Sequence, residues 1–321
     1  MKVFEDKYKI LKSLGHGTSS HGYLVENALK EKFVIKTPAM ESIDAWEQEG
    51  EKEISVLEPL HHLKNHHYIL PLSVLEKSED GEQYMLSTLV RGEALSEKAY
   101  QSMDIVEKKN LAQSLAQFMS DLHSSILPSE NNENSNLEQF FNDKNVKRKI
   151  DKVSRLMPKH ISEKMSGIFS EFESDNNLFK YETMCHNDLV KGNLLYDKDS
   201  KKLGVIDFGD VDRNEIYADF GNLMRLGQLP DEFGVSVIKE YNSLQKEKGR
   251  KVQIDAHTAK RYAILRSFKA LKKLDNMSDT EKKIEILKFD NYLKQYEKNK
   301  SEGIYVTKVK PCLSKDKGLQ R

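Results

Sequence analysis

The stretch from residue 184 to residue 210 constrains the fold of this chain more than any other part of the sequence. It holds two short polar motifs, HNDLVKGN at 186–193 and DFG at 207–209. Between them, apolar runs at 194–196 and 203–206 flank the turn-like sequence DKDSKK. Strand-like runs on either side of a polar turn are typical of a β-hairpin. We therefore expect a polar loop, a hairpin and a second acidic loop, in that order.

Asp188, Asn193 and Asp207 have the residue types and the spacing that phosphoryl transfer requires. In that chemistry an Asp accepts the proton of the attacking hydroxyl, while an Asn and a second Asp hold Mg²⁺ against the nucleotide phosphates. The two motifs match the signature H-R-D-L-x-x-x-N followed by D-F-G, apart from Asn187. Asp, Asn and Gly also gather in ordinary turns. Two such motifs nineteen residues apart, around strand-like runs, are not accounted for by turns alone.

A glycine-rich turn lies near the N-terminus, between strand-like runs at 8–14 and 23–25. Gly15, Gly17 and Gly22 follow the pattern G-x-G-x₄-G. Glycine lets backbone N–H groups approach nucleotide phosphates closely, as in the glycine-rich loop of kinases. The last two glycines are two residues further apart than in the protein-kinase pattern, and an ordinary hairpin is the competing interpretation.

Lys36 ends an apolar strand-like run at 33–36 that resembles the V-A-I-K motif. In that motif the lysine contacts the α- and β-phosphates and pairs with a glutamate of the next helix. Residues 45–64 have helical periodicity. We expect Glu53 to pair with Lys36, and Glu49 is the second choice.

The remaining periodic segments predict two more strands and a series of helices. The strands are expected at 68–75 and 84–90, and an Arg-Gly-Glu sequence at 91–93 ends the second. The helices are expected at 96–125, at 137–180 as two helices with a break near Pro158, and at 232–248, 255–275 and 278–298.

Two helix starts carry capping signals. Asp219 has the residue type and position of an N-cap, and Ser278 with Glu281 forms a capping box. Residues 301–321 lack helical periodicity, so we expect a mobile tail there.

Composition limits the class of protein. The 321 residues suit two domains or one two-lobed enzyme, and 38% hydrophobic residues suffice for a globular core. The formal net charge of +0 gives no field that would attract nucleic acid, although residues 231–300 carry 17 basic and 11 acidic side chains. Two cysteines provide neither a disulfide framework nor metal spacing. Without an apolar signal segment or an 18-residue apolar run, we expect a cytoplasmic protein with no membrane contact, and secretion without a cleaved signal stays open.

The order of these motifs resembles the protein-kinase-like superfamily, and more specifically its aminoglycoside phosphotransferase and choline kinase branch. The resemblance covers roughly residues 8–300 and is carried by CHNDL, GNLLYD, GVIDFGD and YADFGNL. It implies an α+β, two-lobed fold: a small antiparallel β-sheet N-lobe with one helix, and a larger, mostly helical C-lobe. The corresponding boundaries are 1–90 for the N-lobe and 91–300 for the C-lobe, followed by the tail at 301–321.

The resemblance also implies an activity, a nucleotide-dependent kinase that phosphorylates a hydroxyl of a small molecule. Asp188 would be the catalytic base and His186 would brace its loop, while Asn193 and Asp207 would hold Mg²⁺. The nucleotide would be ATP, with GTP possible. The expected nucleotide-binding residues are Gly15, Gly17, Gly22, Lys36, Glu53, Ser87, Thr88, Leu89 and Val90.

Departures from protein kinases favour a small-molecule acceptor. Val190 stands where Ser/Thr protein kinases usually place lysine, and only 12 residues separate Asp207 from Asp219, with no A-P-E motif. A peptide-docking activation loop has no room in that interval. Two alternatives stay open, a protein kinase that docks a macromolecule on its basic C-terminal region and a nucleotide-binding pseudokinase.

The acceptor itself is not determined by the sequence. An aminoglycoside is polycationic and needs an acidic pocket, to which Asp212, Glu215 and acidic residues of the helical insert before the catalytic loop could contribute, but the basic excess at 231–300 disfavours it. Choline needs an aromatic cage, for which Tyr217, Tyr241 and Tyr262 are candidates. A neutral sugar, a nucleoside or an anionic compound also fits, and the oligomeric state is not determined.

Overall fold

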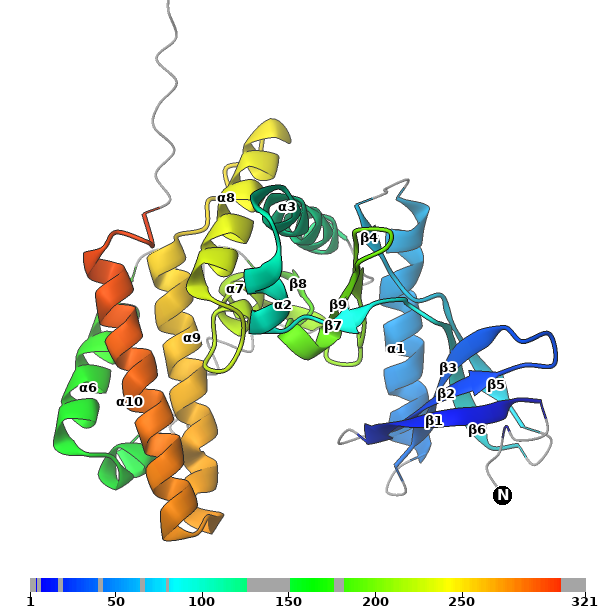
Figure 1. Ribbon diagram of the computed structural model, residues 1–321, viewed down its shortest axis with the longest axis horizontal. Helices are drawn as coiled ribbons and strands as arrows, with labels where there is room; N and C mark the ends of the chain where they lie inside the picture. Colours follow the sequence, from blue (N-terminus) through cyan, green and yellow to red (C-terminus); the bar gives the residue numbers. More distant parts are fainter. Residues whose placement is uncertain are drawn as a thin grey trace, which may run out of the picture.

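The computed structural model describes residues 4, 7–16, 20–39, 43–63, 67–78, 81–125, 151–175 and 182–306. Its N-terminal part is an antiparallel sheet of five strands in the order β1-β2-β3-β6-β5. These strands are β1 (Lys9–His16), β2 (Ser20–Glu26), β3 (Lys32–Pro38), β5 (Ser73–Lys77) and β6 (Gln83–Thr88). The helix α1 (Ile43–His62) lies beside this sheet, as Figure 1 shows.

The N-terminal sheet has its own small core. Val25, Ile35 and Tyr84 are fully buried, one on each of three neighbouring strands, and Phe4 packs with them. Side chains of a strand alternate between its two faces, so these residues come together on one side. The C-terminal half of α1 buries Val56 and Leu60, which lie four residues apart on one face, in the main core instead. The helix thereby joins the sheet to the rest of the molecule.

A second sheet includes the two strands that lie between the motif loops in the sequence. Its strand order is β4-β10-β9-β7, with β4 (Tyr68–Ile69), β7 (Glu93–Ala94), β9 (Leu194–Asp197) and β10 (Lys202–Val205). β9 and β10 form the hairpin that the sequence predicts. A separate pair, β8 (Glu182–Cys185) with β11 (Asp212–Glu215), has no counterpart in the sequence prediction. Both motifs therefore lie in loops whose ends are fixed by strands.

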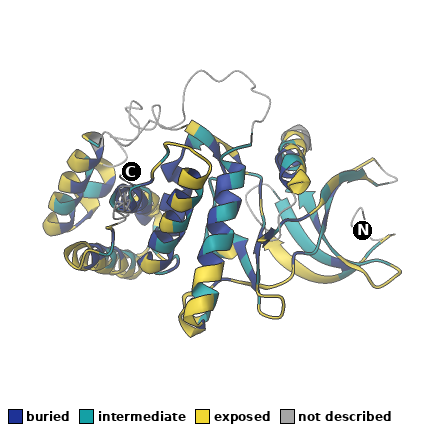
Figure 2. Ribbon diagram, turned by 90° about the horizontal axis from the view of Figure 1, so that it is seen from above, coloured by how far each residue is buried: buried dark blue, intermediate teal, exposed yellow. Residues whose placement is uncertain are grey.

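The C-terminal part is mostly helical (Figure 1). Its elements are α2 (Glu97–Ser102), α3 (Ile105–Leu122), α6 (Lys159–Glu173), α7 (Tyr217–Leu223), α8 (Asp231–Glu247), α9 (Ala256–Ala270), the 3₁₀ helix η2 (Leu271–Asn276) and α10 (Asp279–Ser301). Figure 2 shows that several of these helices are buried along one side and exposed along the other. On α3 the buried side includes Leu115, Phe118 and Leu122, the stripe expected from a 3.6-residue period. The predicted α+β fold, with an antiparallel sheet followed by a helical region, is confirmed.

Several element predictions agree with the structure within a few residues, but two segments are divided. The strand expected at 68–75 is β4 and β5, which belong to different sheets, and the helix expected at 96–125 is α2 and α3. The helix expected at 255–275 is shorter, because α9 ends at Ala270 and η2 follows. The capping box of Ser278 and Glu281 is present at the start of α10. The predictions for Gly17, for parts of 137–180 and for the tail after residue 306 lie outside the described residues. The prediction that the tail begins at residue 301 is wrong, because α10 continues to Ser301 and the buried Tyr305 donates a hydrogen bond to Asp231 Oδ2 at 2.5 Å.

The prediction that Asp219 is an N-cap is wrong. The helix α7 starts two residues earlier, after Ile216, and Asp219 lies inside its first turn. The carboxylate is fully buried and accepts hydrogen bonds from another loop, as described below. An N-cap aspartate would instead bond the N–H groups of its own helix.

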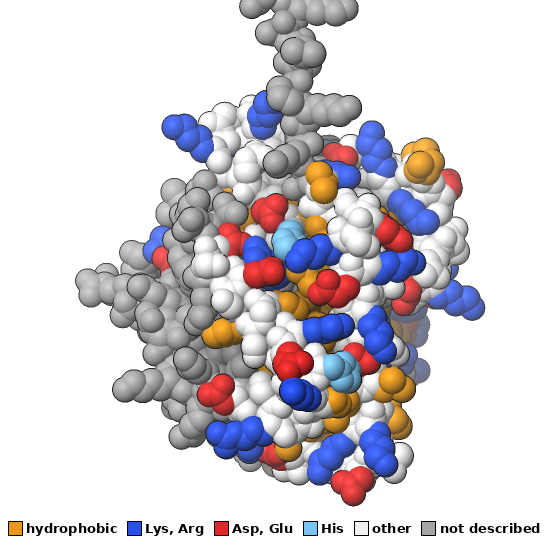
Figure 3. Space-filling model, turned by 90° about the vertical axis from the view of Figure 1, so that its left-hand side faces the viewer, with side chains coloured by type: hydrophobic (Ala, Val, Ile, Leu, Met, Phe, Trp, Pro, Cys, Tyr) orange, Lys and Arg blue, Asp and Glu red, His pale blue; other side chains and the backbone are white. Residues whose placement is uncertain are grey.

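The surface of the helical part carries mixed charge. Figure 3 views the end of the molecule at which α6 and α10 lie, and Lys and Arg side chains alternate there with Asp and Glu. On α10, Lys294 lies 2.7 Å from Asp290 and Lys288 lies 2.8 Å from Glu285. These pairs lie within 231–300 and leave its basic excess unchanged, but Lys300 of α10 lies 3.8 Å from Glu171 of α6, outside that segment, and so offsets part of the excess. Among the helices that the structure describes, none has the length and hydropathy to cross a membrane.

Candidate active site

Asp219 holds the loop that carries the first motif. Its Oδ2 accepts the backbone N–H of His186 at 2.9 Å, and its Oδ1 accepts that of Asn187 at 2.8 Å. Asn187 has a φ of 63°, a left-handed conformation that asparagine adopts more readily than most residues. Two charge-assisted bonds at a bend of this kind fix the backbone directly before Asp188.

Asp188 and Asn193 contact each other within this loop. Nδ2 of Asn193 donates to the backbone carbonyl of Asp188 at 2.9 Å and to its Oδ2 at 3.0 Å. The carboxylate is half-buried, and this burial raises the pKa of Asp188 above its ordinary value. The positive charge of Arg225 offsets part of that rise. Asp188 is thus an oriented carboxylate with an increased affinity for a proton.

Lys36 connects the N-terminal sheet to the second motif. Its Nζ lies 3.1 Å from Oε2 of Glu53 on α1 and 3.0 Å from Oδ1 of Asp207. Burial alone would lower the pKa of Lys36, but the two carboxylates together raise it. The contact between Lys36 and Glu53 is the one expected from the sequence. Glu49, the second choice, lies beside the second motif, where a Cβ added to Gly209 would come within 2.7 Å of its Oε1.

A polar cavity of about 90 Å³ lies at this meeting point. Its lining consists of Ser20, Lys36, Trp46, Glu49, Gly50, Glu53, Met85, Asp207, Gly209 and Asp210. Typical ligand pockets have volumes of about 300–1,000 Å³, so this cavity corresponds to the space around a phosphate or a metal ion and not to a complete nucleotide site. The carboxylate of Asp207 is half-exposed here, while Asn193 offers an amide oxygen nearby in the loop after Asp188. Oxygen donors of these two types suit Mg²⁺.

The structure also places the glycine-rich turn and the nucleotide-binding residues expected at 87–90. Gly15 pairs with Gly22 across the β1–β2 hairpin and has a φ of 112°, a conformation open to glycine. Ser87 is buried and hydrogen-bonded to Ser73 at 2.8 Å. The backbone N–H of Thr88 donates to Leu72 O at 2.9 Å. The Thr88 N–H is therefore hydrogen-bonded within the sheet in this conformation. Of the N–H groups expected to bind the nucleotide at 88–90, those of Leu89 and Val90 are left.

His186 lies behind the two motif loops and does not face the cavity. The side chain is fully buried, its Nε2 is 3.2 Å from the carbonyl oxygen of Ile206, and its ring packs against Phe208 with centroids 5.0 Å apart. A residue in this position links the first motif to the second. Its geometry fits a positioning residue.

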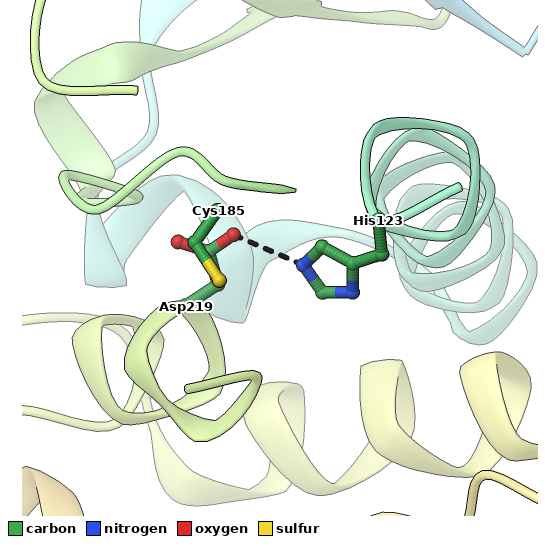
Figure 4. Close-up of side chains that lie close together, drawn as sticks. All are labelled: His123, Cys185 and Asp219. Carbon is green, nitrogen blue, oxygen red and sulfur yellow. Dashed lines mark hydrogen bonds and ion pairs between the residues drawn. The ribbon is translucent and has the colours of Figure 1, made fainter. Parts of the chain in front are cut away.

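His123 is a site residue that the sequence analysis did not identify. Figure 4 shows its ring beside Asp219 and Cys185, with Nε2 at 3.1 Å from Asp219 Oδ2. The three potential ligand atoms of this cluster lie within 4.8 Å of one another, which would permit a metal ion. Each of them already has a protein partner, however: His123 Nδ1 bonds the Tyr241 hydroxyl at 3.0 Å, and the Cys185 thiol donates to Glu215 O at 3.6 Å. We interpret the cluster as the internal anchor of the catalytic loop.

The structure does not place the residues considered for a cationic acceptor where that hypothesis requires them. Glu215 is buried, and Asp212 lies 3.1 Å from Lys52. The three tyrosines considered for an aromatic cage are core residues. They are Tyr217, Tyr241 and Tyr262. None of these five side chains therefore forms the acidic or aromatic wall that the hypothesis required.

Comparisons with known proteins agree with this fold. The family model described as "Phosphotransferase enzyme family" matches residues 10–251. The ADP-bound aminoglycoside phosphotransferase APH(2'')-Ib is 23% identical, with a TM-score of 0.59 and coverage of 91% of this chain and 96% of that chain. The GDP complex of aminoglycoside 2'-phosphotransferase-IIIa is 20% identical, with a TM-score of 0.61 and coverage of 91% and 94%. Choline kinase from Cryptosporidium parvum Iowa II is 14% identical, with a TM-score of 0.57 and coverage of 94% and 92%. At these identities the solved structures show a shared fold and do not identify the substrate.

Proposed function

The chain belongs to the phosphotransferase enzyme family, and from that premise we propose that it transfers the terminal phosphate of a nucleoside triphosphate to a hydroxyl of a small molecule. The observation that carries the proposal is the convergence of Asp188, Asp207 and Lys36. These residues come from the two motif loops and from the N-terminal sheet, and Lys36 contacts Asp207 at 3.0 Å.

Asp188 would orient the acceptor hydroxyl and take its proton. The acceptor oxygen then forms a bond to the γ-phosphorus, and the bond from that phosphorus to the β,γ-bridging oxygen breaks. The proton goes from Asp188 to solvent, and the nucleoside diphosphate leaves. The bond from Asn193 at 3.0 Å fixes the carboxylate, and its raised pKa makes it a better proton acceptor than an exposed aspartate.

The nucleotide phosphates would be bound from both sides of the cavity. Lys36 supplies a positive charge that Glu53 holds in place, and the hairpin at Gly15 and Gly22 supplies backbone N–H groups. Asp207 and Asn193 would hold Mg²⁺, which neutralises charge that develops on the phosphate oxygens. The solved relatives contain ADP in one case and GDP in another, which supports a nucleotide and leaves ATP or GTP to experiment.

The segment after Asp207 supports a small-molecule acceptor. The chain enters β11 at Asp212, and the side chain of Asn187 bonds both sides of that entry, Asp210 O at 3.0 Å and the Asn214 amide at 2.7 Å. A short segment tied to the catalytic loop offers no platform for an extended peptide. The solved relatives are also named as enzymes of small molecules, an aminoglycoside phosphotransferase and a choline kinase.

The test is an assay of Mg²⁺-dependent nucleotide consumption by the purified protein. ATP and GTP would each be combined with aminoglycosides, choline, ethanolamine, sugars, sugar phosphates, hydroxy acids and nucleosides, with Asp188→Ala as the blank. We expect acceptor-dependent diphosphate release in one chemical class and none with Asp188→Ala. Phosphate transfer to proteins alone would contradict the proposal, and so would full activity of the variant.

A further inference from the structure

Arg225 lies in the turn after α7, and this turn contacts the loop that carries the first motif. The side chain of Gln228 accepts the backbone N–H of Lys191 at 2.8 Å, and Gly227 O accepts from Lys191 Nζ at 2.5 Å. Lys191 lies three residues after Asp188. The turn that follows Arg225 therefore contacts the loop that begins at Asp188, and the positive charge of Arg225 acts on the Asp188 carboxylate.

The backbone on both sides of Arg225 is held from behind. Met224 O accepts from the Tyr292 hydroxyl at 2.7 Å and from the buried Lys260 Nζ at 3.1 Å. The N–H of Leu226 donates to Ser267 Oγ at 3.1 Å. Contacts from α9 and α10 thus fix the position of Arg225 before any ligand binds, and such preorganisation lowers the entropic cost of binding.

Charged side chains of both signs act on Arg225. Its guanidinium is half-buried and interacts with the positive charge of Arg266 as well as with Asp188. Within the described part of the chain, no carboxylate lies within 4.0 Å of either guanidinium, whereas such pairs occur at other buried cations such as Lys260. Burial first, and Arg266 next, lower the pKa of Arg225. Two neighbouring, partly desolvated cations are unfavourable unless an anion joins them.

We propose that the phosphate acceptor carries an anionic group, a carboxylate or a phosphate, which binds between Arg225 and Arg266 while its hydroxyl reaches Asp188. This inference rests on the proposed phosphotransfer and specifies its substrate class. Planar guanidinium groups bind carboxylates and phosphates through paired hydrogen bonds. The same two positive charges repel a polycationic acceptor, and of the acidic residues considered for one, Glu215 is buried and Asp212 is paired with Lys52.

The test compares acceptors that differ in charge and little else. Glucosamine, glucose and glucose 6-phosphate form one series, and ethanolamine, glycerol, glycerate and glycerol 3-phosphate form another. Binding of each compound is measured by calorimetry with the Mg²⁺ complex of a non-hydrolysable ATP analogue bound, and kcat/KM is measured with ATP at pH 8.5. For the wild-type chain we expect an anionic member to bind tightest in at least one series.

Variants of Arg225 distinguish recognition of the anion from a purely structural role of this residue. Arg225→Gln should lower kcat/KM for the anionic acceptor about 10- to 100-fold, the usual effect of removing a hydrogen bond to a charged group, and change the neutral analogue about 3-fold or less. Arg225→Glu should rank the cationic member above the anionic one. Arg155→Gln, at an exposed arginine distant in sequence, is the matched control and should leave the ranking unchanged.

Tighter binding of every cationic or neutral member than of its anionic partner would overturn the inference. So would an equal loss for all acceptors in Arg225→Gln, or the failure of every anionic compound to bind. Failure of the proposed function looks different, because anionic compounds would then bind in an Arg225-dependent manner without any transfer of phosphate.

Discussion

At the scale of single residues, Asp188 carries the chemistry that we propose. The described contacts of its side chain are those to Asn193, so replacing the carboxylate removes little packing. Asp188→Asn should lower kcat/KM by about 10²–10⁴-fold, the usual contribution of a general base. Its unfolding midpoint in urea should stay close to that of the wild type. Asp199→Asn, at an exposed turn between β9 and β10, is the control, and an equal loss of activity there would contradict the assignment.

The pH dependence of kcat/KM tests the surroundings of Asp188. A base must be ionised to act, so activity falls as the pH drops through its pKa. Because burial raises that pKa, the acidic limb should lie above the value of about 3.9 for a free aspartate. Arg225 favours the ionised form, so Arg225→Gln should move the limb to still higher pH. A limb that stays in place in this variant would show that the arginine does not act on the base.

Residues that belong to a motif could be predicted, including the tertiary contact of Lys36 with Glu53, and residues that act through a tertiary contact outside any motif could not. Asp188, Asn193 and Asp207 follow from motif spacing within one stretch of sequence. His123 lies 96 residues before its partner Asp219, and nothing in its neighbours along the sequence indicates that contact. The position of Arg225 beside Asp188 likewise depends on how α7 ends and how Gln228 bonds Lys191.

At the scale of elements, α7 holds the catalytic loop through one carboxylate. Asp219 accepts hydrogen bonds from the backbone of His186 and Asn187 and from the ring of His123. Burial alone would raise the pKa of Asp219, but these bonds and the charge of His123 lower it below its ordinary value. The stability it provides is thus present above pH 4, roughly the unfolded-state pKa, and is lost as pH falls through the folded-state pKa.

Asp219→Asn should therefore lower the free energy of unfolding by about 2–4 kcal/mol, because one oxygen acceptor is replaced by a donor that faces buried N–H groups. Urea denaturation at pH 7 measures the change, and the loss of activity should exceed that expected from the unfolded fraction. Asp121→Asn, at a partly exposed carboxylate of α3, is the comparison. A loss no larger than that of Asp121→Asn would contradict the anchoring role.

Long periodic elements were predictable and short strands were not. The stripe of α3 and the start of α10 follow from the 3.6-residue period and from a capping box. β7, β8 and β11 have two to four residues each, too few to show a period, and they exist through pairing with distant segments. The N-cap prediction for Asp219 failed for a related reason, since its true partners lie about 30 residues earlier in the chain.

At the scale of the whole molecule, the connection between the two sheets depends on Gly92. It has a φ of 121°, and an added Cβ would lie 2.7 Å from the carbonyl carbon of Tyr196 and 2.8 Å from Asp197 N. Both are backbone atoms of β9 that have no freedom to move away. Gly92→Ala should therefore destabilise the chain by at least about 2–3 kcal/mol, through strain and overpacking together.

Gly167→Ala is the matched control for that prediction. Gly167 lies within α6, and a Cβ added there meets nothing within 4 Å. Alanine in an exposed helix is favoured over glycine by about 0.5–1 kcal/mol, so this variant should be more stable than the wild type. Chemical denaturation of both variants measures the two effects. Equal midpoints would contradict the role given to the close approach at Gly92.

The overall architecture was predictable because the motifs occur in a fixed order along most of the chain. The strand-lysine-helix order of the N-terminal part and the two-loop stretch at 184–210 together specify a sheet followed by helices. Charge totals were a poorer guide, because part of the basic excess at 231–300 pairs with carboxylates outside that segment, such as Lys248 with Asp121 and Arg261 with Asp175. Function at this scale depends on which charges face the catalytic loop.

The most direct measurement is ³¹P NMR of a reaction that contains the purified chain, Mg²⁺, ATP and the pooled small-molecule acceptors. The account predicts a new phosphomonoester resonance that grows as the γ-phosphate signal of ATP declines, and no such resonance with Asp188→Asn. Release of inorganic phosphate alone, unchanged spectra both with ATP and with GTP in its place, or the same new resonance with the variant would contradict the claim that this site phosphorylates a small-molecule hydroxyl.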